Sequence, residues 1–542
     1  MKSPIRVRWL LALLCSSGFL VFTPRLHAID EKDIRQHVQR AESLERNNDW
    51  EQARQIYEGL LGQKDHGLKI RDRYNNALRH CWQVRRHQDT SYRIEVLKLD
   101  FGQAMDIHQV ISNALLDQSV EKKKIDPTKL FHKGMQEFDS ALADPFFVKE
   151  HVPESKRGEV AAFRASMKKV WSKKTDLTTE GAAKQIREVA MAAGRDLYLS
   201  STVVAMEFAC GACYAIDEYT AYLTPNQLNE LVQSLTRSEA IGVGLHLAMS
   251  DGRVIIQGIA MGSPAAERPQ DIKIGDLIIS VNKKAVVDSP LLNVKELLEG
   301  PVGSMVDIEI LTPNEPSTRV IRLLRVRATV PSVISFMVPD SPYGYLKISS
   351  FTKTTLQDVD EALQRLTRAN MKGLILDLRD NNGGLFESAI ETARRFLSRG
   401  TITSTIHQDP QKSLLYMATD ANALSLPMVV LVDGDTASAA EVLAGALKDN
   451  DRAILIGQTT FGKGCTQWVL SLRKAAGNVP TGGMKLTVAR FYSPEGIAYT
   501  GRGVVPHFTI DEPMMASESM MNRDPYFEKA IEELNRKIAM PK

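Results

Sequence analysis

The carboxyl-terminal half of the chain alternates between short apolar runs and amphipathic segments. Helical patterns begin near Thr355, Leu385 and Ala439, and they separate four runs that have the length of buried strands: YGYLKISSF, GLILDLR, MVVLVDG and AILIG. Apolar strands that alternate with amphipathic helices indicate a layered α/β domain. Because strands that are apolar throughout must be covered on both faces, this alternation restricts the fold of the chain more than any other feature.

A different pattern fills the residues from Ala240 to about Val326. Short β-rich runs alternate there with turns, and one helical segment, SPLLNVKELLEG, interrupts them. This predicts a small β-domain with an inserted helix. The segments IGVGLHL, GSPAAE, IKIGDLIISVN and GPVGSMVDIEIL, in this order, resemble a PDZ domain.

The resemblance to a PDZ domain implies a peptide-binding loop at Ile241, Gly242, Val243, Gly244 and Leu245. The two glycines open a loop whose backbone N–H groups can hold the carboxylate at the C-terminus of a peptide. The adjoining strand would pair with that peptide as an added strand. The stretch AAERPQDIKIGD departs from the usual sequence of such domains, so the preferred peptide is not defined.

Residues 30 to about 120 contain few Gly or Pro and carry apolar residues at helical spacing. The segment NNDWEQARQIYEGLL resembles half of a tetratricopeptide unit, with Trp50, Ala53 and Tyr57 on one face. The sequence shows no convincing second copy, so a plain helical hairpin is the favoured interpretation. The helical pattern continues through residues 125–235.

The first 28 residues are typical of a secretory signal. Lys2, Arg6 and Arg8 precede the apolar run WLLALLCSSGFLVF, and Ala28 ends a candidate cleavage site. We therefore expect export to the periplasm or cell envelope. An uncleaved N-terminal membrane anchor is the alternative, because Leu26 is large for its place before the cut.

Net charge and cysteine spacing argue against two function classes. The formal net charge is +3, and the first 28 residues hold four basic residues and no acid, which leaves −1 for the rest. A nucleic-acid-binding protein is therefore not expected. Cys210 and Cys213 form a CGAC motif, but no second pair completes a zinc site. We interpret them as buried helix cysteines.

Ser438 lies between the strand MVVLVDG and the helix AAEVLAGALKDN, at or near the helix N-terminus. Unpaired N–H groups and the helix dipole favour negative charge there. They would also stabilise an oxyanion formed when Ser438 attacks a carbonyl. The alternative is that Ser438 is only an N-cap, which serine often is. On this stretch alone, the cap is the better interpretation.

Lys463 favours the interpretation of Ser438 as a nucleophile over that of an N-cap. It lies in TTFGKGCTQ just after the strand AILIG, which in a layered α/β unit returns beside MVVLVDG and brings its end near the serine. A serine hydroxyl needs a base to become a nucleophile, and a lysine can serve when burial keeps part of it neutral. Gln467, four residues later, is placed to orient the amine.

A second turn offers the other half of an oxyanion site. In LILDLRDNNGGLFESAIETA, a strand is followed by two glycines and then a helix. The backbone N–H of Gly383 or Gly384 can point at the site, as an oxyanion donor must. For one of the two glycines, a turn that needs positive φ is an equally natural explanation.

Seven segments in order carry a resemblance to a known family: IDEYTAYL, GYLKISSF, DLRDNNGG, TASAAEVLAGALKD, GQTTFGKGCTQ, MKLTVARFYSPEG and GRGVVPHF. Over roughly residues 125–510, the chain resembles the C-terminal processing peptidases, also called tail-specific proteases. This family consists of serine–lysine endopeptidases, and the resemblance implies a crotonase- or ClpP-like core.

The family resemblance assigns roles to individual residues. It implies that Ser438 is the nucleophile, Lys463 the general base and Gln467 the residue that orients the lysine. It places the oxyanion donors on the backbone of Ala439 and of the Gly383–Gly384 turn. Two positions depart from the family pattern: Asn382 stands where the family has proline, and Cys465 where it commonly has serine.

The expected function is therefore that of an exported serine endopeptidase that cleaves protein substrates near their C-termini, without a metal or an organic cofactor. The PDZ-like domain would recruit or sense substrate C-termini, which we expect to be apolar. The helical N-terminal region is a candidate for binding an adaptor or for self-association. The alternative is a non-catalytic binding or scaffold protein on the same fold, against which Ser438, Lys463 and Gln467 together argue.

These patterns predict a multidomain α+β chain. Its expected parts are a signal peptide at 1–28, a helical region at 29–120, a helical part of the protease core at 121–238, a PDZ-like domain at 239–328, a catalytic α/β domain at 329–512 and a helical tail at 513–542.

Overall fold

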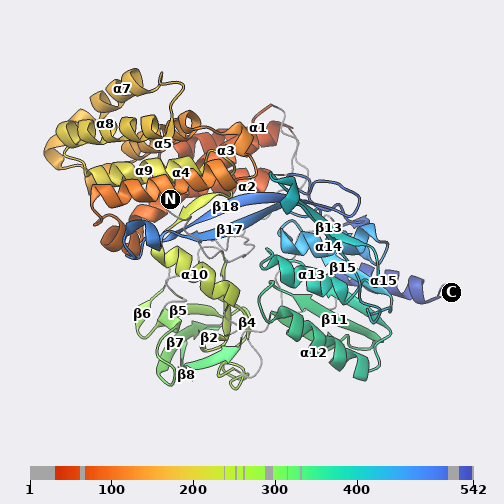
Figure 1. Ribbon diagram of the computed structural model, residues 1–542. Coiled ribbons are helices and arrows are strands. Elements are labelled where there is room, and N and C mark those ends of the chain that lie inside the picture. Colours follow the sequence, from red (N-terminus) through yellow and green to blue (C-terminus); the bar gives the residue numbers. More distant parts are fainter. Residues whose placement is uncertain are drawn as a thin grey trace.

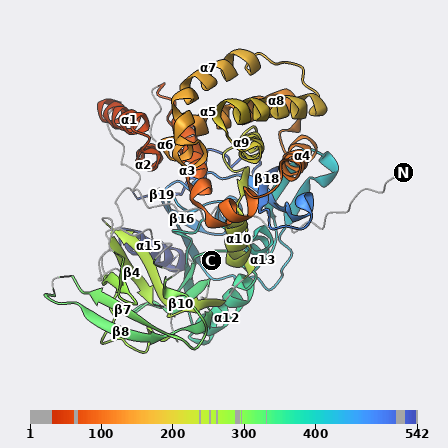
Figure 2. The ribbon, with the colours of Figure 1, turned by 90° about the vertical axis from the view of Figure 1, so that its left-hand side faces the viewer.

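The computed structural model confirms the expected multidomain α+β organisation. A layer of helices, a small β-domain and an α/β domain can be followed in Figure 1, and Figure 2 shows the side on which the first helices lie. Within the described residues, no helix combines the length and the apolar character that a membrane span requires. The predicted signal at 1–28 lies outside the described residues, which are 31–61, 67–236, 239–250, 253–259, 263–286, 294, 297–313, 315–329, 332–510 and 524–539.

The helical layer is built around helix α9 (Ser201–Cys213). Every residue of α9 after Ser201 is buried, and the helix packs against α4, α5 and α8. Cys210 and Cys213 are unpaired and buried in it, as the sequence predicts. The other helices of the layer are α1 (Glu31–Arg46), α2 (Trp50–Leu60), α3 (Ile70–Gln88), α4 (Phe101–Gln118), α5 (Pro127–Ala143), α6 (Pro145–His151), α7 (Val160–Trp171) and α8 (Thr179–Leu197), whereas α10 (Pro225–Thr236) lies outside the layer and leads into the β-domain (Figure 1).

A buried cluster of charged residues joins α3 to the centre of this layer. Glu207 of α9 is fully buried, and its carboxylate accepts hydrogen bonds at 2.9 Å from Arg86 and at 2.8 Å from Gln83. His87 lies 2.9 Å from the same carboxylate, and Arg86 also reaches Glu137 of α5 at 3.3 Å. Burial by itself would raise the pKa of Glu207, but Arg86 and His87 outweigh it and hold that pKa below its ordinary value.

The β-domain inserted after α10 has the architecture that its sequence pattern predicts. A sheet in the order β3-β4-β5-β7-β8 surrounds an apolar core, and β2 pairs with β9 where the chain enters and leaves. Most of the predicted inserted helix lies outside the described residues. The strands are β2 (Glu239–Gly242), β3 (Leu245–Ser250), β4 (Arg253–Ile259), β5 (Leu277–Val281), β6 (Lys284–Ala285), β7 (Met305–Leu311), β8 (Arg319–Leu324) and β9 (Val326–Thr329).

The α/β domain contains a six-stranded sheet in the order β10-β11-β12-β15-β16-β19, parallel except for β10. Leu376 and Val430 face a core shared with helices α12, α13 and α14, whereas Ile375 and Val429 face helix α15. Because side chains alternate between faces, apolar strands bury both. The elements are β10 (Val333–Met337), β11 (Tyr343–Ile348), α12 (Thr355–Arg368), β12 (Gly373–Asp377), α13 (Phe386–Arg394), β15 (Met428–Val432), α14 (Ala439–Asp449), β16 (Ile454–Gly457), β19 (Phe508–Thr509) and α15 (Pro525–Ala539).

A second sheet lies between the helical layer and the α/β domain (Figure 1). Strand β18 (Gly483–Tyr492) pairs with β1 (Ala221–Leu223), with β13 (Thr401–His407) and with β17 (Cys465–Ser471), and β14 (Leu414–Met417) pairs with β13. The helical prediction for 125–235 is wrong at β1. Three residues carry no readable period, and β1 exists because it pairs with a strand about 260 residues away.

We predict that Arg86→Ala destabilises the whole protein. It leaves the Glu207 carboxylate buried without its arginine, and breaking a buried ion pair lowers the free energy of unfolding by about 3–5 kcal/mol. Chemical denaturation of purified variants measures this. Arg35→Ala is the matched control, because Arg35 and Glu31 are both about half exposed, and its effect should stay below about 1 kcal/mol. Equal unfolding free energies for both variants would contradict the prediction.

Candidate active site

Ser438 occupies a strained turn between buried strand β15 and helix α14. Its φ is 56° and its ψ is −115°, a backbone conformation that non-glycine residues rarely adopt. Such strain costs roughly 1–3 kcal/mol and persists only where the surroundings impose it. Every residue from Ala439 to Leu447 is buried, so α14 is packed firmly enough to impose it.

The Ser438 side chain is buried and is not used as a helix cap. Its exposed fraction is 0%, and its Oγ makes no hydrogen bond to any residue within the described ranges. The backbone N–H of Ser438 does have a partner, because it donates to the Glu441 carboxylate at 2.7 Å. A buried hydroxyl without a partner is unfavourable in a purely structural serine. The geometry therefore favours a chemical role over the N-cap interpretation.

Lys463 lies in the loop between β16 and β17, next to the serine turn. Strands β15 and β16 pair in parallel, so their carboxyl ends lie together. The Phe461 N–H donates to the Thr436 carbonyl at 2.9 Å and ties the loop to the serine turn. Lys463 is buried, and its Nζ lies 5.1 Å from the centre of the Tyr219 ring.

Gln467 is the third residue of β17 and also contacts Tyr219. Its Nε2 donates to the Tyr219 carbonyl at 2.6 Å, whereas its Oε1 is buried and has no hydrogen-bond partner among the described residues. That Gln467 orients the Lys463 amine stays a prediction, and its amide oxygen is the atom that could accept from that amine. The segment IDEYTAYL carries part of the family resemblance, but the sequence did not indicate that Tyr219 belongs to the site.

The Gly383–Gly384 turn is connected to the serine turn through Asn381. The Ala437 N–H donates to the Asn381 carbonyl at 2.9 Å. The Gly383 N–H donates to Asn381 Oδ1 at 2.8 Å, so in this structure it is already engaged. Gly384 has φ +136°, and a Cβ there would lie 2.1 Å from the Phe351 carbonyl oxygen. Gly384 thus has to be glycine, and with Ala439 it remains a candidate oxyanion donor.

Glu441 is a site residue that sequence reasoning missed. It is fully buried, and its Oε2 accepts from the N–H of Ser438 at 2.7 Å and of Lys463 at 2.8 Å. Its Oε1 accepts from Thr460 Oγ1 and from the Gly462 N–H, both at 2.6 Å. Burial raises the pKa of Glu441, and these four donors oppose that rise. The sequence signal was a capping-box glutamate three residues after a serine.

Three carboxylates lie at the start of the serine turn. Oxygens of Asp380, Asp433 and Asp435 lie within 4.8 Å of one another and could hold a metal ion by geometry. Asp433 is already engaged with the N–H groups of Asp380, Asp435 and Thr436, and Asp380 lies 3.3 Å from Lys347. The expectation that this chain needs no metal stays a prediction.

The peptide-binding loop predicted in the β-domain lies between β2 and β3. Val243 is buried, and its carbonyl accepts from the Ala265 N–H at 3.0 Å. Gly244 has φ +85°, and a Cβ there would lie 2.1 Å from the side chain of Ser263. Gly242 is different, since a Cβ there would meet no atom of the described residues within 4 Å. Only Gly242 can therefore be enlarged without disturbing the loop.

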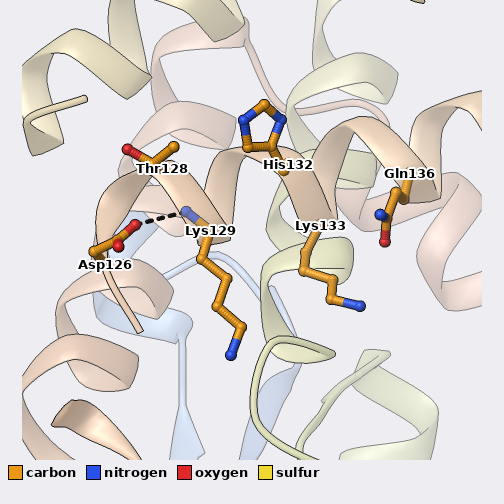
Figure 3. Close-up of a pocket in the computed structure, with 6 residues that line it drawn as sticks. All are labelled: Asp126, Thr128, Lys129, His132, Lys133 and Gln136. Carbon is orange, nitrogen blue, oxygen red and sulfur yellow. Dashed lines mark hydrogen bonds between the residues drawn. The ribbon is translucent and has the colours of Figure 1, made fainter. Parts of the chain in front are cut away.

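A polar cavity of about 340 Å³ opens along helix α5, away from the residues above. Figure 3 shows that its side chains come from the first turns of α5 and that Asp126 accepts the Lys129 backbone N–H. It contains none of the predicted site residues. Its lining residues are Asp126, Thr128, Lys129, His132, Lys133 and Gln136.

Cys465 follows the lysine loop, and we predict that its thiol takes no part in the reaction. Burial raises its pKa, and Asp217 raises it further, so the thiol stays protonated. Cys465→Ser and treatment of the wild type with iodoacetamide should both leave peptide hydrolysis within about twofold of wild type, since the thiolate is the reactive form. Loss of activity in both experiments would make Cys465 the nucleophile candidate instead of Ser438.

Comparisons with known proteins agree with the two functional regions. The family model described as Peptidase family S41 matches residues 342–510, and the PDZ domain model matches residues 232–311. The PDZ interpretation of the β-domain is confirmed.

Relatives of this chain are processing proteases. The carboxyl-terminal-processing protease of Synechocystis sp. is 32% identical over 60% of this chain and 75% of its own length. The chloroplastic C-terminal processing peptidase of Tetradesmus obliquus is 32% identical over 56% of this chain and 67% of its own. Bacillus subtilis CtpA, a carboxy-terminal processing protease, is 31% identical over 60% and 67%. Among solved structures, a photosystem II D1 C-terminal processing protease is 28% identical over 71% of this chain and 94% of its own, with a TM-score of 0.36.

Proposed function

Because the chain belongs to the family of carboxyl-terminal-processing serine peptidases, we propose that it cleaves protein substrates near their C-termini with a Ser438–Lys463 dyad. The observation that carries the proposal is the junction of two loops at the ends of β15 and β16. It brings a strained, buried serine with an unpaired hydroxyl beside a buried lysine. A serine hydroxyl and an amine base are the minimum for nucleophilic acyl transfer.

In the proposed reaction, Ser438 Oγ attacks the scissile carbonyl while its proton passes to the Lys463 amine. The carbonyl oxygen takes up negative charge, and the N–H groups of Ala439 and Gly384 stabilise it at the start of α14. The lysine then gives its proton to the leaving amine as the peptide C–N bond breaks. A water molecule activated by Lys463 hydrolyses the acyl-enzyme and restores Ser438.

The described geometry corresponds to a resting state in this proposal. Ser438 Oγ has no hydrogen bond to Lys463 or to any other described residue, and Ser438 is not exposed. Substrate therefore has to open access to the serine and move the lysine amine into contact with it. Apo sites often tighten only in the substrate complex, and Tyr219 is the group that the lysine would leave.

The PDZ domain supports a substrate with a free C-terminus. We propose that residues 241–245 bind that carboxylate through backbone N–H groups and that β3 pairs with the peptide. We propose an apolar last residue because Val243 of the loop and Leu247 of β3 belong to the apolar core of the domain. Export to the periplasm or cell envelope is part of the proposal, and it rests on the pattern of residues 1–28.

Ser438→Ala and Lys463→Ala should each abolish hydrolysis of an unstructured protein with an apolar C-terminus, without changing the thermal midpoint by more than a few degrees. Lys463→Arg should also be inactive, because a guanidinium stays protonated and cannot accept the serine proton.

Wild-type activity should rise with pH and should not respond to a metal chelator. Activity in either alanine variant, or inhibition by a chelator that zinc reverses, would exclude the dyad.

Amidation of the substrate C-terminus should weaken cleavage about ten- to hundredfold in kcat/KM. It removes a charge and an acceptor oxygen, and losing charge-assisted hydrogen bonds costs about 1.5–3 kcal/mol. Gly242→Val should reproduce this loss with the free acid, because a side chain there projects into open space and hinders the peptide. Gly244→Val is unsuitable, since its Cβ would collide with Ser263. Equal rates for acid and amide on both proteins would mean that the domain does not read C-termini.

A further inference from the structure

Glu441 holds the two loops of the proposed dyad together through one oxygen atom. Glu441 Oε2 accepts the backbone N–H of Ser438 at 2.7 Å and that of Lys463 at 2.8 Å. Because both amides donate to the same oxygen atom, each lies within one hydrogen-bond length of it. This one atom therefore limits how far apart the backbones of Ser438 and Lys463 can lie.

The other oxygen of the same carboxylate, Oε1, binds the lysine loop at residues that precede Lys463. Glu441 Oε1 accepts from Thr460 Oγ1 and from the Gly462 N–H, both at 2.6 Å. Thr460 Oγ1 in turn accepts the Val504 N–H at 2.6 Å. All four groups that face the carboxylate are donors, so it has to act as an acceptor only, which an ionised carboxylate does and an amide does not.

The serine conformation also depends on this contact. Ser438 holds a strained φ of 56°, and among the described residues its backbone N–H donates only to Glu441, three residues later in the chain. The lysine loop is tied to the serine turn elsewhere by the bond from Phe461 to Thr436. That bond ends two residues before Lys463, whereas Glu441 accepts the backbone N–H of Lys463 itself.

We propose that Glu441 is a positioning residue that sets the separation and orientation of Ser438 and Lys463, and this rests on the dyad proposed above. Glu441 reaches the reaction through the backbone of both residues and touches no substrate. Its loss should therefore lower kcat and leave KM unchanged, because peptide recognition belongs to the PDZ domain and its loop.

The test compares Glu441→Gln with Thr460→Val on a fluorogenic peptide that has a free apolar C-terminus. In Glu441→Gln, an NH₂ group in place of Oε2 breaks the bridge between Ser438 and Lys463, and in place of Oε1 it faces the Gly462 N–H and displaces the loop just before Lys463. We expect kcat to fall about a hundredfold or more, as for a misplacement of about 1 Å, with KM within about twofold.

Thr460→Val is the comparison variant, because it removes one donor to Oε1 and leaves both bonds to Oε2. Its kcat should fall less than about tenfold even where its thermal midpoint drops as far as that of Glu441→Gln. If activity instead follows the thermal midpoint in both variants, Glu441 serves stability alone and the proposal is wrong.

Glu441→Asp covers the case in which the glutamine variant does not fold. It keeps an acceptor-only carboxylate but is one methylene shorter, so it reaches one loop and not both; kcat should fall and KM should not. Failure of both variants to fold, or wild-type kcat in either, would overturn the proposal. Ser438→Ala and Lys463→Ala are measured in the same assay. Activity in either of them would contradict the proposed dyad. If both are inactive while Glu441→Gln is active, the dyad stands and only the proposal for Glu441 is wrong.

Discussion

The parallel pairing of β15 with β16 is the constraint on which the site depends. Val430 pairs with Leu455 and Val432 with Gly457, and both strands are buried on two faces. Parallel neighbours end at the same edge of a sheet, so the loops that carry Ser438 and Lys463 have to meet there. The packing of α14 against this sheet then imposes the strained serine turn. The site is therefore a product of core packing and does not depend on a surface loop.

Much of this could be predicted because it is local in sequence. The alternation of apolar strands and helices indicated the sheet, and the β-rich runs indicated the inserted domain. What could not be predicted depends on contacts between distant segments. Strand β1 forms only against β18, Tyr219 reaches Gln467 across 248 positions, and Glu441 looks like a helix cap until the loop of Lys463 is seen to share its carboxylate. Secondary-structure propensity and hydrophobic periodicity describe neighbouring residues only and cannot predict such contacts.

The burial of Ser438 has a physical consequence for how the enzyme avoids unwanted cleavage. An exposed, activated serine would react with any peptide that diffuses past. Here the hydroxyl is inaccessible and has no hydrogen bond to the lysine, while the Lys463 amine lies over the Tyr219 ring. Cation–π contact is worth about 0.5–2 kcal/mol, which substrate binding can readily outweigh. In the proposed mechanism, reactivity is therefore assembled by substrate and is low without it.

The helical N-terminal region supports this arrangement. The turn after α3 holds the segment that carries Tyr219: the Asp89 carboxylate accepts from Thr224 and Asn226, and the Ser91 hydroxyl accepts the Asn226 N–H at 3.0 Å. Upstream, α3 supplies the arginine that Glu207 needs. Deleting residues 29–120 would leave the buried Glu207 carboxylate without its arginine and would also loosen the segment whose Tyr219 contacts Lys463. Loss of activity in such a deletion would therefore say nothing about partner binding. An adaptor or self-association role has to be examined on the exposed faces of α1 and α2, with α3 left in place.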